Sequence, residues 1–157
     1  MEFTIARATA DERDFDDVCD LMLELHREGG YAVLNGQKMA NSIFGALEEG
    51  MTFLARSEAG EPIGVIAMIE FAFWYSDETF LEDRAFYVRP QYRVRPGFQG
   101  KSVGVELLRA VRDEGQARNK ITFVTVANPD RKPKRTAMSM AGQRLGFVPI
   151  GYTLKLN

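Results

Sequence analysis

The chain contains a single cysteine and a single histidine, and their scarcity excludes several classes of protein. Cys19 has no second cysteine with which to form an intramolecular disulfide, so the sequence is not that of a disulfide-stapled domain. Cys19 and His26 together also fall short of the ligand set of a structural zinc site. We expect Cys19 to be an inert core thiol and the protein to work in a reducing compartment, most simply the cytoplasm.

Long apolar runs and a large net charge are missing as well. The longest apolar stretch, residues 63–69, ends at Glu70, whereas a membrane-spanning helix needs roughly 20 apolar residues. The N-terminus lacks the basic region of a secretory signal, so we expect no membrane partner. Lysine and arginine number 20 against 22 aspartate and glutamate, for a net charge of −2, so any attraction for nucleic acid must be local.

What the sequence does contain is enough apolar material for one core. Its 157 residues are 45% hydrophobic, with no repeat and no long polar linker, so we expect one domain over residues 1–157. Apolar periodicity predicts a first helix up to Gly29, introduced by a capping box of Thr9 and Glu12, and a second helix ended by Gly50. It also predicts helices at 102–117 and 134–145, and strands at 3–8, 51–57, 62–75, 80–88, 121–127 and 147–156.

The order of these elements predicts a mixed α/β architecture. Three consecutive strands in the middle of the chain imply an antiparallel meander, and the later alternation of helix and strand implies a parallel pair. We therefore expect a mixed central sheet that is covered by helices on both faces.

The segment from residue 87 to residue 104 carries the clearest functional signal. A strand ends there, a basic loop with several glycines follows, and an amphipathic helix begins near Ser102. The unpaired N–H groups and the positive end of a helix bind phosphate, and Arg93, Arg95 and Lys101 can add charge-assisted hydrogen bonds. The alternative is a solvated basic connection whose glycines only make turns.

Four motifs in this order resemble the GNAT superfamily of acyl-CoA-dependent N-acyltransferases. They are the strand ending in Tyr87-Val88, the helix start Gln99-x-x-Ser102-x-Gly104, the strand ITFVTVAN, and Leu145-Gly146-Phe147. The resemblance covers nearly the whole chain and implies a mostly antiparallel sheet with a parallel, splayed pair. It further implies that acetyl-CoA is the cofactor and that an acetyl group is transferred directly to a primary amine within a ternary complex.

The resemblance implies a coenzyme A site along the strand end and the loop after it. The strand end would pair with the pantetheine arm, and backbone N–H groups of the loop would hold the pyrophosphate. Ser102 replaces the first glycine of the motif, and both Arg93 and Gln99 fit its leading position. The expected cofactor-binding residues are Tyr87, Val88, Arg93, Arg95, Gln99, Gly100, Lys101, Ser102, Val103, Gly104 and Asn128.

The expected catalytic groups are incomplete. Glu82 lies on the strand where some members of this family carry a glutamate base, although Glu82 or Asp83 could instead pair with Arg84 or with a loop arginine for structural reasons. The family's usual acid is a tyrosine in the last helix, four residues before the Gly-Phe pair, and Gly142 stands there. Ser139 and Tyr152 are substitute candidates for the acid.

For the acceptor, an acidic stretch enters the same strand and would attract a cationic amine of a small molecule or a peptide. The candidate substrate-binding residues are Tyr31, Trp74, Tyr75 and Asp83. Two other functions stay open. The missing tyrosine suits a catalytically weak acyl-CoA sensor, and the basic and aromatic residues of 87–101 suit a nucleic-acid-binding module, against which the net charge argues. A single final strand at the edge hints at a homodimer.

Overall fold

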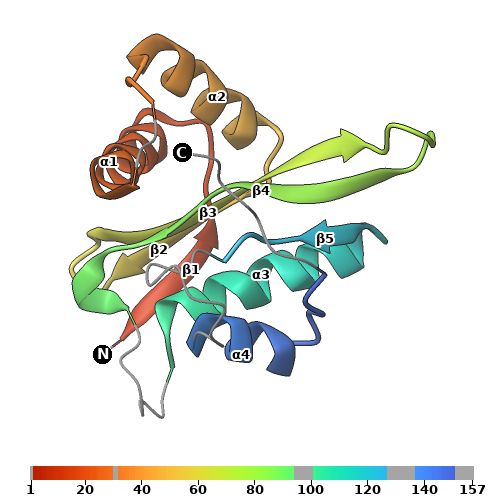
Figure 1. Ribbon diagram of the computed structural model, residues 1–157. Helices are drawn as coiled ribbons and strands as arrows, with labels where there is room; N and C mark the ends of the chain where they lie inside the picture. The colour runs from red at the N-terminus through yellow and green to blue at the C-terminus, as the bar shows by residue number, and fades with distance from the viewer. Residues whose placement is uncertain (1, 30–31, 94–100, 127–136, 151–157) are drawn as a thin grey trace.

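A five-stranded mixed sheet forms the centre of the protein (Figure 1). The computed structural model describes residues 2–29, 32–93, 101–126 and 137–150. The strands lie in sequence order, and β1 to β4 pair antiparallel while β4 and β5 pair parallel, which confirms the predicted sheet. They are β1 (Phe3–Arg7), β2 (Thr52–Ser57), β3 (Pro62–Ala72), β4 (Thr79–Val88) and β5 (Ile121–Phe123).

Helices cover both faces of this sheet (Figure 1). The first pair, α1 (Glu12–Gly29) and α2 (Gly36–Glu48), lies on one face, and α3 (Val103–Ala117) and α4 (Ala137–Arg144) lie on the other. A short 3-10 turn, Pro90–Tyr92, follows β4. The mixed α/β class and the GNAT-like arrangement of layers are therefore as the sequence predicts.

Two apolar layers hold the helices to the sheet. Val103, Leu107 and Val111 recur at helical spacing along α3 and pack on Ile66, Met68 and Leu81 of the sheet, all fully buried. On the other face, Val18 and Leu21 of α1 and Leu47 of α2 pack on Leu54 and Val65. Cys19 lies partly buried beside this second layer, and burial raises the pKa of its thiol, as expected of an inert cysteine.

The start of α1 is capped differently from the prediction. Asp11, not Thr9, accepts a hydrogen bond from the backbone N–H of Asp14 at 2.8 Å, and the Asp14 carboxylate accepts one from the Thr9 backbone N–H, also at 2.8 Å. The N-cap is therefore Asp11, two residues later than predicted, because aspartate is at least as good an N-cap as threonine. The pair is not a full capping box, since the Asp14 carboxylate returns to Thr9 and not to Asp11. Glu12 takes no part in it among the contacts described.

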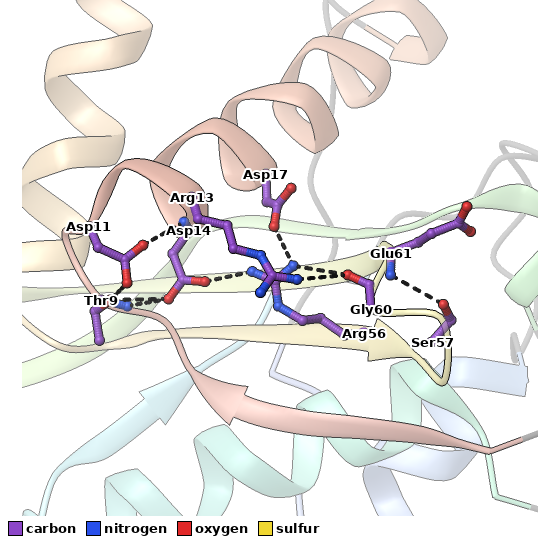
Figure 2. Close-up of polar contacts among 9 residues, drawn as sticks. All are labelled: Thr9, Asp11, Arg13, Asp14, Asp17, Arg56, Ser57, Gly60 and Glu61. Atoms are coloured by element: carbon purple, nitrogen blue, oxygen red, sulfur yellow. Dashed lines mark hydrogen bonds and ion pairs between the residues drawn. The ribbon is translucent and has the colours of Figure 1, made fainter.

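A cluster of charged side chains fastens α1 to the β2–β3 hairpin (Figure 2). Arg56 of β2 reaches Asp14 at 2.5 Å and also pairs with Asp17, one turn further along α1. Arg56 and Arg13 both point at the carbonyl oxygen of Gly60, in the hairpin turn. Gly60 has a φ of +80°, which glycine adopts without strain. The cluster therefore fixes the position of α1 along the sheet.

Three predicted boundaries are wrong. β3 ends at Ala72, not residue 75, because the chain turns at Trp74 and Tyr75, a turn closed by a hydrogen bond from the N–H of Ser76 to the carbonyl of Phe73. β5 ends at Phe123, not 127. No strand begins at Phe147, whose N–H instead bonds to the carbonyl of Gly142 and closes the end of α4. The remainder of that expected strand, 151–157, lies outside the described residues.

Candidate functional site

The strands β4 and β5 form a fork. Their ladder holds only three pairs, Phe80 with Ile121, Leu81 with Thr122 and Glu82 with Phe123. β4 nevertheless continues to Val88, still paired with β3 on its other side. In the part of the chain that the structure describes, the β5-facing edge of β4 beyond Glu82 therefore has no strand partner. An open edge of this kind presents backbone hydrogen-bonding groups to an extended ligand.

A β-bulge in β4 marks the point where the strands separate. Ala67 of β3 faces Ala85 and the next residue, Met68, faces Asp83, so Arg84 is the extra residue of β4. Beyond the last ladder pair, the backbone N–H of Thr125 donates to the carboxylate Oδ1 of Asp83 at 2.5 Å. Burial raises the pKa of Asp83, although hydrogen bonds from Thr125 oppose the change.

The N-terminus of α3 packs against the end of β4. A Cβ added to Gly64 would lie 3.0 Å from Cγ1 of Val103 and 3.1 Å from the carbonyl oxygen of Tyr87, so these backbones pass close together. Gly104 is equally confined, because a Cβ there would meet Met138 of α4 at 2.3 Å. The N–H groups of the first turn of α3 thus lie beside the open end of the fork.

Ser102 occupies the N-cap position of α3 with an extended backbone, at φ −119° and ψ 132°. Its side chain makes no capping hydrogen bond, and the residue is only 5% exposed. The hydroxyl Oγ has no hydrogen-bond partner among the residues that the structure describes. A buried hydroxyl without a partner costs free energy unless something else bonds to it, and here it sits at a helix N-terminus that attracts anions.

The end of β4 is tied to α1 through Arg93. Its Nε donates to the carbonyl oxygen of Val88 at 2.6 Å, and its Nη2 pairs with Glu28 at 2.7 Å. The same guanidinium lies over the ring of Tyr87, 5.2 Å from its centre. The Tyr87 hydroxyl donates to Glu28 at 2.6 Å, and burial together with this carboxylate raises the pKa of Tyr87. Arg93 therefore has a carboxylate partner within the protein.

Arg89 is held in a similar way. It pairs with Glu24, 2.9 Å from Nη2, on the face of α1 that also carries Glu28. Sequence reasoning missed these two glutamates. Their spacing of one helical turn was the available signal, because it places both carboxylates on the same side of α1, but it does not reveal which strand they meet.

Glu82 is exposed and lies on the opposite face of the sheet from Asp83, as neighbours on a strand must. Its side chain makes no hydrogen bond or ion pair with another residue of the described chain. The alternative in which Arg84 pairs with Glu82 or Asp83 is not formed, since the Arg84 guanidinium lies over the ring of Phe71, 5.7 Å from its centre. The carboxylate of Glu82 is thus accessible beside the fork.

Aromatic rings continue from Glu82 toward the tip of the β3–β4 hairpin. Phe80 packs edge-on against Phe123 at 5.3 Å and lies 4.6 Å from Phe73, while Phe73 stacks on Tyr75 at 5.5 Å. Trp74 and Tyr75 at the tip are 93% and 68% exposed. Aromatic surface of this extent is unusual on a protein exterior and marks a candidate binding surface.

The remaining candidate residues are less informative. Lys101 is exposed, with its ammonium 4.9 Å from the centre of the Phe3 ring. Ser139 of α4 accepts a hydrogen bond from Gln143 at 3.5 Å, and Gly142 packs between Leu108 and Phe147. The expected site residues that lie outside the described part of the chain are Tyr31, Arg95, Gln99, Gly100, Asn128 and Tyr152.

The sequence matches the model of the acetyltransferase (GNAT) family over residues 15–147. This chain belongs to the GNAT acetyltransferase family. The match spans the fork, the start of α3 and the helix α4. No curated protein matches this GNAT sequence significantly.

Several solved structures share the fold of this GNAT protein, and acetyltransferases are among them. An integron cassette protein from a salt-marsh metagenome is 19% identical, with a TM-score of 0.68 over 98% of this chain and 88% of its own. A predicted acetyltransferase of Clostridium acetobutylicum, solved with acetyl-CoA, is 16% identical, with a TM-score of 0.64 over 99% and 95%. An aminoglycoside 6'-N-acetyltransferase of Acinetobacter baumannii is 15% identical, with a TM-score of 0.62 over 99% and 97%.

The described residues offer neither a clustered set of metal ligands nor a membrane-spanning helix. The described residues contain no group of three or more histidine, cysteine, aspartate or glutamate side chains placed to bind a metal ion. Within the same residues, no helix has the length and apolar character needed to span a membrane. Acyltransferase chemistry and acyl-CoA binding are the activities that family membership supports.

Proposed function

We propose that this GNAT protein transfers an acetyl group from acetyl-CoA to a primary amine, directly and within a ternary complex. The observation that carries the proposal is the buried hydroxyl of Ser102 at the start of α3, which has no hydrogen-bond partner among the described residues and lies beside the open edge of β4. The start of α3 offers charge-assisted hydrogen bonds to a phosphate, and the edge of β4 offers backbone groups to an extended amide chain. Coenzyme A carries both features in one molecule.

The chemistry of the described residues suits coenzyme A. The pyrophosphate would be held by the Ser102 hydroxyl, by the backbone N–H groups of Val103 and Gly104, and by Lys101 from the exposed side. Tyr87 and Val88 would lie along the pantetheine arm. From the sequence motif, Arg95, Gly100 and Asn128 complete the proposed cofactor site.

The contacts of Arg93 favour Gln99 as the leading residue of the phosphate loop. Arg93 would have to leave Glu28 and the Val88 carbonyl before it could reach a phosphate. Each hydrogen bond that Arg93 gives up in this way offsets part of what a new contact to a phosphate would contribute. We therefore assign Arg93 to holding the strand end against α1, and Gln99 to the motif position.

Glu82 is the proposed general base. The amine must lose a proton before its nitrogen can attack the thioester carbonyl, which acetyl-CoA supplies. The Glu82 carboxylate is exposed and has no cationic partner among the described residues, and Glu82 belongs to the last ladder pair of the fork. The proton needed by the departing thiolate would come from Ser139, Tyr152 or solvent, with Gly142 at the position of the family's tyrosine.

The proposed acceptor is a cationic amine that approaches over the aromatic face of the hairpin. Trp74 and Tyr75 are exposed at its tip, and the carboxylates of Asp77 and Glu78 lie between the tip and β4. Aromatic faces and carboxylates both attract ammonium groups. Tyr31, in the connection between α1 and α2, is a further proposed contact. A small-molecule amine or a peptide amine would satisfy this chemistry.

A weak acyl-CoA sensor of the same fold is the second candidate, favoured by the glycine at position 142. The nucleic-acid reading has lost support, because Arg89 and Arg93 are both bound to glutamates of α1. The sensor would bind acetyl-CoA and release no coenzyme A across a panel of amines.

A thermal melt tests the proposal first. Acetyl-CoA at about 100 times its dissociation constant should add about 2.7 kcal/mol of stability and raise the melting temperature by several degrees. ATP and NAD serve as anionic controls that should produce smaller shifts. An equal shift with ATP, or none with acetyl-CoA, would contradict the cofactor assignment and make salt-dependent oligonucleotide binding the next measurement.

A matched pair of serine variants locates the site. Ser102→Ala removes the buried hydroxyl and should weaken acetyl-CoA binding up to about tenfold, since one hydrogen bond contributes about 0.5–1.5 kcal/mol. Ser42→Ala on α2 removes an exposed hydroxyl outside the proposed site and should leave binding unchanged. Titration calorimetry with both variants measures the difference.

A further inference from the structure

Asp83 does at the fork what a backbone carbonyl does in a regular sheet. In a parallel ladder the N–H groups of one strand donate to backbone carbonyl oxygens of its neighbour. β5 follows this rule up to Phe123, opposite Glu82. Two residues later, the Thr125 N–H donates at 2.5 Å to the side-chain Oδ1 of Asp83 instead. The Asp83 side chain therefore bridges the backbones of β4 and β5 at this point. Because it is longer than a backbone C=O bond, it spans a wider gap than a ladder hydrogen bond does.

The position of Asp83 on the sheet suits such an insertion. It follows Leu81 by two residues and so shares the face covered by α3, where Leu81 is fully buried. It also immediately precedes Arg84, the bulged residue that turns β4 away from the ladder. The bulge directs β4 away from β5, and the carboxylate satisfies the Thr125 N–H that this divergence would otherwise leave unpaired.

We propose that Asp83 is a positioning residue, whose carboxylate holds β5 away from β4 and so keeps open the edge along which the pantetheine arm binds. This inference rests on the proposed function and replaces substrate contact as the role of Asp83. Without the carboxylate, the Thr125 N–H would be left to water, and β5 would lose the contact that sets its distance from β4. The edge that the cofactor needs would then no longer be held open.

Two substitutions at Asp83 separate its geometry from its charge. Asp83→Asn keeps an oxygen acceptor of the same length and should bind acetyl-CoA within about threefold of the unchanged protein. Asp83→Ala removes the acceptor and should weaken binding about tenfold or more, which corresponds to about 1.4 kcal/mol. Asp113→Ala, which removes an exposed carboxylate from α3, is the matched control and should bind normally.

The donor gives an independent pair of variants, in case Asp83→Ala fails to fold. Thr125→Pro removes the N–H while leaving the carboxylate intact, and it should weaken acetyl-CoA binding as Asp83→Ala does. Thr125→Ala keeps the N–H and should bind within about threefold of the unchanged protein.

Amide hydrogen exchange supplies a readout that needs no cofactor. The Thr125 amide should exchange about tenfold faster or more in Asp83→Ala than in the unchanged protein, and at nearly its normal rate in Asp83→Asn. Normal acetyl-CoA binding by both Asp83→Ala and Thr125→Pro would overturn the proposal, as would a loss in Asp83→Asn as large as in Asp83→Ala. If the unchanged protein does not bind acetyl-CoA, the proposed function itself fails and this inference falls with it.

Discussion

At the scale of single residues, two adjacent carboxylates on β4 have opposite surroundings. The Glu82 side chain is exposed and has no polar partner in the described chain, whereas the Asp83 side chain is half-buried and accepts a hydrogen bond from the backbone N–H of Thr125. Strand alternation puts them on different faces of the sheet, so one substitution can be made without disturbing the other. Substitution of Glu82 should change turnover, whereas substitution of Asp83 should change cofactor binding and stability.

Glu82→Gln should lower kcat by about 10² or more if Glu82 is the base, because the amide cannot accept the proton of the amine. Its dissociation constant for acetyl-CoA should stay unchanged, since the side chain lies away from the start of α3. Steady-state kinetics with the best amine of a panel, together with titration calorimetry, measures both quantities. An unchanged kcat would remove Glu82 from the mechanism.

Asp83 should make the stability of the protein depend on pH. Burial raises the pKa of Asp83 in the folded state, so its contribution to stability is complete below the unfolded pKa of about 3.9 and is lost as the pH rises through the folded pKa. The melting temperature of Asp83→Asn, relative to the unchanged protein, should therefore be higher at pH 7 than at pH 4. Thermal melts over this range check the sign, and a difference that falls with pH would contradict it.

At the scale of elements, much of the fold could be predicted because apolar periodicity follows the buried faces. The stripe of Val103, Leu107 and Val111 located α3 to within a residue of its start. The end of β5 could not be predicted, because it depends on Asp83, 42 residues away. The cap of α1 was misplaced for a different reason, since several neighbouring residues there can accept the same hydrogen bond.

The candidate site was predictable only in part. The motif located the start of α3, but the buried, unpartnered state of the Ser102 hydroxyl depends on packing that no local pattern encodes. The contact between Arg93 and Glu28 joins residues 65 positions apart, and the proposed separation of the roles of Arg93 and Gln99 rests on it.

Two glycines in helices should respond to alanine in opposite ways. A Cβ added at Gly115 of α3 would lie 2.0 Å from the Thr122 hydroxyl, so Gly115→Ala should destabilise the protein by about 1–3 kcal/mol through overpacking. A Cβ added at Gly142 of α4 would lie 3.8 Å from Phe147, which is an ordinary contact, so Gly142→Ala should stabilise the protein by about 0.5–1 kcal/mol. Chemical denaturation measures both, and equal effects would contradict the packing described.

The link between α1 and β2 should depend on Arg56. Arg56→Met leaves Asp14 and Asp17 half-buried without their cation, and should lower the free energy of unfolding by about 1–3 kcal/mol. Arg112→Met breaks a pair with the exposed Asp113 and should cost less than about 1 kcal/mol. Urea denaturation compares the two, and a similar loss in both would show that the cluster in Figure 2 is ordinary surface charge.

At the scale of the whole molecule, the two helical layers have separate tasks. α3 and α4 lie on the face where the proposed cofactor site begins, and α1 and α2 lie on the face that carries Glu82 and the aromatic rings (Figure 1). The proposed reaction would therefore join two ligands through the sheet, at the place where β4 and β5 part. The sheet itself sets their relative position, because Glu82 and the strand end at Tyr87 and Val88 all belong to β4.

The three-pair ladder between β4 and β5 also bears on how the protein comes apart. β3 and β4 share nine register pairs, whereas β5 is attached by three. Local opening should therefore begin at β5 and spread to α4, while the meander of β1 to β4 stays closed. A ligand that binds both β4 and the start of α3 would stabilise the C-terminal third of the chain, which contains β5 and α4, against this local opening. Limited proteolysis would then report cofactor binding as protection of the C-terminal third, well away from the phosphate contacts themselves.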